Sequence, residues 1–68
     1  MKTYVTFGQT HIHSVNGKTF DKDCVAVVDG GRDKVFEIFG PKFGFEYSED
    51  EWNEEAMKYF PRGYITVD

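Results

Sequence analysis

Hydrophobic and polar residues follow three different spacings in the central part of the chain. Residues 25–28 are a short apolar run, rich in β-branched side chains, which is typical of a buried strand. Between residues 35 and 39 the apolar side chains recur at helical spacing, and the polar ones point away from them. A strand period follows, and it predicts three aromatic side chains that face the core: Phe43, Phe45 and Tyr47.

The helix between these two strands has recognisable ends. We expect it to run from about residue 31 to residue 39, with the Asp29 carboxylate accepting backbone N–H groups of its first turn. Gly40 can adopt the left-handed conformation that closes a helix, and Pro41 cannot continue one. The sequence therefore predicts one amphipathic helix closed by glycine and proline.

The N-terminal part of the chain predicts a hairpin. Residues 3–13 are rich in β formers, and Asn16-Gly17 is a strong signal for a two-residue turn, because both positions need positive φ. With that turn, Val5 faces Val28 and Phe7 faces Ala26. One side of the hairpin then collects its apolar residues, which are Val5, Phe7, Cys24, Ala26 and Val28.

The C-terminal part predicts a second, short or partly 3₁₀ helix and a last strand. Ser48 and Glu51 have the spacing of a capping box. Residues 64–67 are strand formers. One helical side after the box collects Trp52, Ala56, Tyr59 and Phe60. We therefore expect a single α+β domain over residues 1–68, in the order β-β-α-β-α-β, with a four-stranded, mainly antiparallel sheet and one main helix packed on one face.

The amino-acid composition indicates the cellular compartment in which the protein folds. Seven Phe, four Tyr and one Trp supply a core, and Cys24 is the single cysteine, so no internal disulfide forms. A small domain without disulfides and without an apolar N-terminal segment is expected in the reducing cytoplasm. The longest apolar run, residues 24–28, is far too short to span a membrane.

Charge is distributed unevenly. The net charge is −4, and residues 1–28 carry one excess positive charge, so the negative charge lies in the rest of the chain. Six acids and no base lie within residues 46–55. This balance argues against direct nucleic-acid binding. Two interpretations stay open: a solvated helix side, or a surface that docks on a basic groove of a host or phage protein through Glu49, Asp50, Glu51, Glu54 and Glu55.

Two histidines and the cysteine form the other candidate site. On a strand, His11 and His13 share one side at roughly 7 Å, and Cys24 falls on the same side in the predicted hairpin. The three could bind zinc. The plainer interpretation is a hairpin end with solvated histidines and a small buried cysteine. No carboxylate is spaced to make either histidine a catalytic base, so no catalytic residue and no resident cofactor are expected.

Several short motifs together resemble a set of small proteins encoded by bacteriophages and prophages. The motifs are Phe7-Gly-Gln9 with His13, Phe36-Glu-Ile-Phe-Gly40, the Phe43-x-Phe45-x-Tyr47 strand and Phe60-Pro-Arg-Gly63. The resemblance implies a phage origin and no particular mechanism. We therefore expect a small protein-binding module, in its most concrete form an anti-CRISPR-like inhibitor of a host defence protein. The alternatives are a metal-binding protein or a self-associating structural protein, so both monomer and homodimer stay open.

Overall fold

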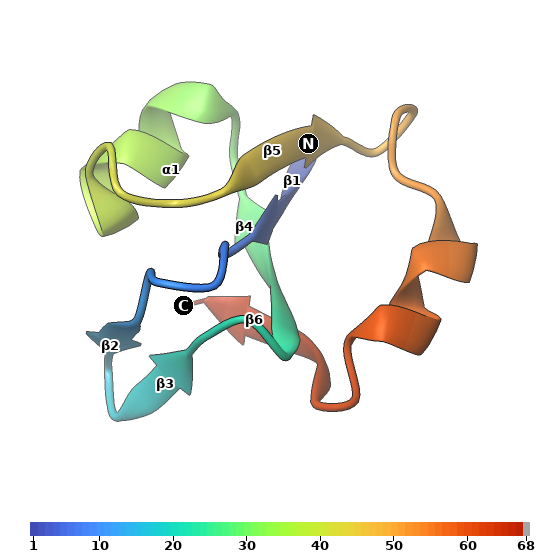
Figure 1. The fold of residues 1–68 in the computed structure, drawn as a ribbon. Helices are drawn as coiled ribbons and strands as arrows, with labels where there is room; N and C mark the ends of the chain where they lie inside the picture. The colour runs from blue at the N-terminus through green and yellow to red at the C-terminus, as the bar shows by residue number, and fades with distance from the viewer. Residues whose placement is uncertain (68) are drawn as a thin grey trace.

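A four-stranded mixed sheet forms the centre of the molecule. The structure is a computed structural model that describes residues 1–67 (Figure 1). In the sheet order β5-β1-β4-β6, β1 is antiparallel to β4 and β5, and β6 is parallel to β4. The strands are β1 (Lys2–Thr6), β4 (Cys24–Asp29), β5 (Phe45–Ser48) and β6 (Gly63–Val67). The predicted α+β class and the mainly antiparallel sheet are confirmed.

The predicted Asn16-Gly17 turn is present, but it closes a separate ribbon of β2 (His13–Val15) and β3 (Lys18–Phe20). Both turn residues have positive φ, 51° and 79°. The single long hairpin was wrong, because residues 7–12 of its first strand and residues 21–23 of its second strand lie outside any ladder. Val5 consequently pairs with Ala26 instead of Val28. A shift of two residues preserves the side-chain alternation, so the predicted apolar side is still correct.

One face of the sheet, here called the core face, packs against α1 (Arg32–Phe39) and the ribbon. The helix turns Val35 and Phe39 inward, while its Phe36 is 38% exposed. The core consists of Val5, Phe7, Phe20, Cys24, Ala26, Val28, Val35, Phe39 and Val67. Gly40, with φ 67°, ends the helix as predicted and donates its N–H to the Phe36 carbonyl.

The expected Asp29 cap was wrong. Asp29 is the last residue of β4, and the helix begins after Gly31, which makes no side-chain capping bond. The chain turns at Gly30, where φ is 150° and the N–H donates to the Met1 carbonyl at 2.9 Å. That tight turn carries the Asp29 side chain away from the first helical turn.

The aromatic alternation of residues 43–47 does not face the core as predicted. Phe43 packs near Phe36 on the core side, but Phe45 is 67% exposed and lies with Tyr47 on the opposite face. Gly44 explains the change of side. Its N–H donates to the Thr6 carbonyl at 2.8 Å, and a Cβ there would come within 2.9 Å of the backbone of Thr6 and Gly8. The two backbone segments touch at this point, and the regular alternation of side chains begins only at Phe45.

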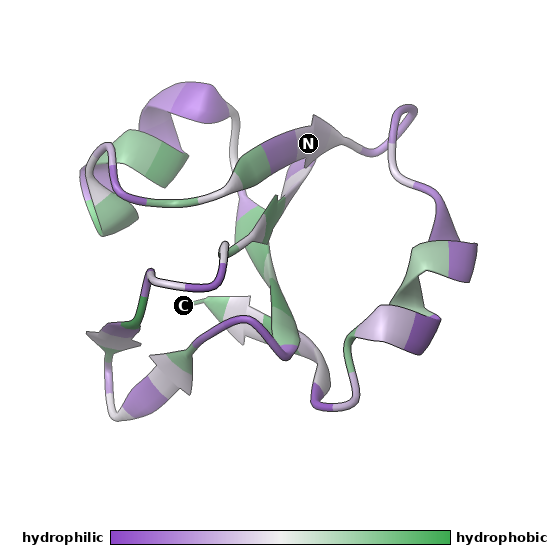
Figure 2. Ribbon diagram, viewed as in Figure 1, coloured by the Kyte–Doolittle hydropathy of each residue, from purple (hydrophilic) through white to green (hydrophobic). Residues whose placement is uncertain are grey.

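The opposite face, here called the arm face, is covered by residues 49–62, which we name the acidic arm. Its only helical part is the 3₁₀ helix η1 (Glu54–Tyr59), which lies on the far side of the sheet from α1 in Figure 1. The second helix is therefore short and of the 3₁₀ type, as expected. In Figure 2, β4 is largely green, whereas the turn before η1 is largely purple. Tyr59, which was expected to pack inward, is 69% exposed.

Candidate functional site

The acidic arm is held to the sheet by one aromatic residue, Trp52. Its ring stacks on Tyr4 with centroids 5.4 Å apart and planes 12° apart. It also contacts Tyr47 at 5.4 Å, and its indole N–H donates to the Tyr64 hydroxyl at 2.9 Å. Tyr4, Tyr47 and Tyr64 come from three different strands. Trp52 therefore fixes the arm just before η1 over the aromatic side chains of the arm face.

Polar contacts fix the start of the arm. The backbone N–H of Lys2 donates to Glu49 at 2.7 Å, and the N–H of Ser48 donates to Glu51 at 3.0 Å. The second contact is half of the predicted capping box, but it closes a turn, because η1 starts only after Asn53. The hydrogen bonds from Ser48 lower the pKa of Glu51 below its ordinary value.

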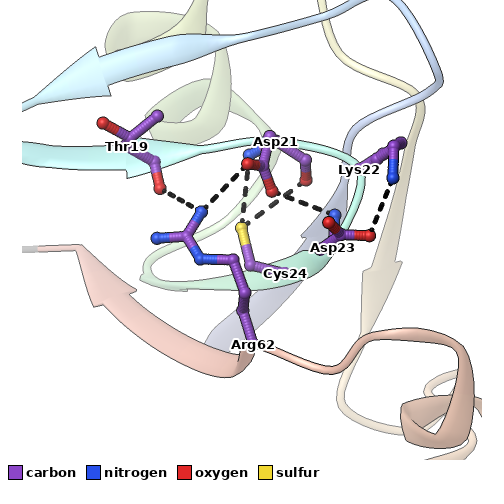
Figure 3. A network of polar contacts seen from close by, with 6 residues as sticks. All are labelled: Thr19, Asp21, Lys22, Asp23, Cys24 and Arg62. Atoms are coloured by element: carbon purple, nitrogen blue, oxygen red, sulfur yellow. Dashed lines mark hydrogen bonds and ion pairs between the residues drawn. The ribbon is translucent and has the colours of Figure 1, made fainter.

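Arg62 fixes the other end of the arm, as Figure 3 shows. Its guanidinium donates to the Thr19 carbonyl at 2.9 Å and lies 3.2 Å from an Asp21 carboxylate oxygen. Its backbone N–H donates to the Asp23 carbonyl at 2.9 Å. The N–H of Asp23, together with Arg62, lowers the pKa of Asp21. The Pro-Arg-Gly motif therefore links the arm to the loop before β4.

The five predicted binding acids divide into two groups. Glu49 and Glu51 accept backbone hydrogen bonds and shape the arm. The other three are exposed, and within residues 1–67 their side chains form no hydrogen bond or ion pair: Asp50, Glu54 and Glu55. Three of the cations nearby are already engaged, since Arg32 pairs with Glu46, Arg62 with Asp21, and Lys58 lies over the Tyr59 ring. The arm therefore keeps an excess of negative charge.

The histidine and cysteine residues are placed differently from the predicted metal site. The His13 ring packs between Phe7 and Phe39, and its Nε2 is hydrogen-bonded to the Lys42 carbonyl. Cys24 is fully buried, and burial raises the pKa of its thiol. In the described part of the chain, no group of three or more His, Cys, Asp or Glu residues could hold a metal ion. His11, His13 and Cys24 are not brought together as ligands.

A small cavity on the arm face was not foreseen. Its volume is about 230 Å³, and it lies between the sheet and the first residue of η1. Its lining residues are Lys2, Tyr4, Val27, Glu54, Tyr64 and Thr66. The available signal was the position of Tyr4 and Tyr64 on the polar side of their strands, but they lie at opposite ends of the sequence. Only the pairing of β6 beside β4 brings them together.

No match was found for this chain among protein-family models, curated proteins or solved structures. Among the described residues, no helix has the length and apolar character needed to cross a membrane. The arguments on function therefore rest on the geometry and charge of the chain itself.

Proposed function

We propose that the protein is a small binding domain that captures a basic surface of another protein through its acidic arm. The observation that carries this proposal is the set of free carboxylates on Asp50, Glu54 and Glu55, presented on an arm anchored at both ends. Such anchoring lowers the ordering cost of binding, since the backbone that carries the acidic side chains is already held in place. A nucleic-acid partner is disfavoured, because these acids repel phosphates.

The proposal has a more specific form. The phage-like motifs support a partner in the cytoplasm of a bacterial host, either a host protein or another phage protein. An acidic surface is suited to occupying a basic groove of a nucleic-acid-binding defence protein, as an anti-CRISPR-like inhibitor does. What supports this form is the sign of the charge together with the resemblance, and it involves binding without catalysis.

Charge-matched variants test the proposal. The double variant Glu54→Gln/Glu55→Gln removes two carboxylates from the arm, and Asp33→Asn/Glu37→Gln removes two exposed carboxylates from α1. In affinity capture from bacterial lysate with mass spectrometry, we expect the wild type and the α1 variant to retain a basic protein. The arm variant should retain it about tenfold less, and salt should release it. Equal retention by both variants would contradict the proposal.

A further inference from the structure

The cavity beside Glu54 identifies the part of a basic partner that the arm face fits. We propose that this cavity receives an arginine side chain of the partner, an inference that rests on the proposed binding function. The cavity is open to solvent and is lined by Glu54 of η1, and its volume of about 230 Å³ can accommodate one long side chain. It therefore gives a general charge attraction a defined point of contact.

The walls of the cavity have the chemistry that a guanidinium needs. Tyr4 and Tyr64 present aromatic rings with centroids 5.8 Å apart, and Trp52 holds both of them in place. Glu54 supplies a carboxylate that has no hydrogen-bond or ion-pair partner within residues 1–67. A planar guanidinium can stack on a tyrosine ring and form two parallel hydrogen bonds to a carboxylate, whereas an ammonium is a compact point charge. Arginine therefore fits the site better than lysine.

Two further charged groups face this region and have to be included. Lys2 lines the cavity, and its sheet partner Asp29 lies opposite it on the same face. The backbone of Lys2 is fixed by its hydrogen bond to Glu49, but its side chain lies on the surface. An arriving arginine meets the like charge of the Lys2 ammonium at the same cavity. We therefore expect that removing the positive charge of Lys2 strengthens the binding of arginine.

The probe for the test is an acetylated, amidated hexa-arginine peptide, followed by amide and side-chain NMR of the labelled full chain. We expect shifts centred on Tyr4, Val27, Glu54 and Tyr64, and weaker binding of hexa-lysine. Glu54→Gln should weaken hexa-arginine binding about tenfold, and its neighbour Glu55→Gln less than about twofold. Lys2→Gln should strengthen it about two- to threefold. All three positions are exposed, so the variants should fold, which the NMR spectra verify directly.

The possible results separate this inference from the proposed function. Equal weakening by Glu54→Gln and Glu55→Gln, or shifts spread over all the acids, would overturn the arginine site and leave the acidic arm as a diffuse binding surface. Equal affinity for hexa-lysine would overturn the guanidinium assignment. An absence of binding to either peptide would overturn the site, while capture of a basic protein that depends on the arm charges would still stand.

Discussion

The two faces of the central sheet are covered in different ways. On the core face, α1 and the ribbon enclose aliphatic and aromatic residues that are almost inaccessible to water. On the arm face, aromatic side chains are covered by Trp52 and the rest of the acidic arm. Phe45 and Tyr64 of the sheet and Tyr59 of the arm remain exposed. The core face therefore has the character of a completed interior. The arm face keeps exposed aromatic groups beside charged ones, a pattern that agrees with the binding role proposed above.

The two faces also differ in the forces that hold their covers. The cover of the core face is held by burial of large side chains, which depends little on pH or salt. The acidic arm is held by Trp52 and by polar contacts at its two ends, at Glu49, Glu51 and Arg62. If this comparison is correct, substitutions on the core face should unfold the whole domain, whereas substitutions at the arm should release the arm alone.

The largest effect is expected for Phe39→Ala. Phe39 is buried and makes edge-on ring contacts with Phe7, Phe20 and His13. Truncation should lower the free energy of unfolding by about 3–5 kcal/mol, because it removes a large buried side chain and leaves a cavity. Urea denaturation followed by circular dichroism would measure the loss. A loss below about 1 kcal/mol would show that the core face is not where stability lies.

A smaller and more local effect is expected for Trp52→Ala. Trp52 is half-buried. Its truncation should lower the free energy of opening of the arm by about 2 kcal/mol, because the stacking and the hydrogen bond to Tyr64 are lost. Hydrogen exchange should accelerate in residues 49–62, while amides of α1 keep their protection. Uniform acceleration throughout the chain would mean that the two faces unfold as one unit, which would break the comparison.

The smallest effect is expected from mild acid. The folded-state pKa values of Asp21 and Glu51 are lowered from ordinary values of 3.8 and 4.5. Each carboxylate therefore stabilises the fold above its ordinary pKa, and that contribution is lost as the pH falls through the lower folded value. On acidification from about pH 5 to pH 2, NMR signals of the arm should broaden before those of α1. Asp21→Asn should remove part of this pH dependence, and a pH-independent arm would contradict it.

Local signals in the sequence predicted much of the core face. The Asn16-Gly17 turn, the Gly40 helix end and the apolar side of the first hairpin are each determined by neighbouring residues, so pattern alone was sufficient. Pattern alone did not determine the register, because the register depends on two connections of unequal length, residues 7–12 and 21–23. The placement of Phe45 could not be predicted either, since it follows from the close approach of Gly44 to β1.

The candidate site was predicted only in its charge. Composition marked the acidic segment that forms the arm, but the sequence did not separate Glu49 and Glu51, which shape the arm, from Glu54 and Glu55, whose side chains form no hydrogen bond or ion pair within residues 1–67. The cavity and the role of Arg62 depend on contacts between residues far apart along the chain. Such contacts arise from the order of the strands, and no short motif contains that information.

The chain contains one tryptophan, and it lies in the arm. Intrinsic fluorescence of Trp52 will thus report the state of the arm, while far-ultraviolet dichroism reports mostly the sheet and α1. A thermal melt recorded with both probes should give two curves that coincide only if the protein unfolds in one cooperative step. Any gap between their midpoints measures directly how independently the arm detaches from the sheet.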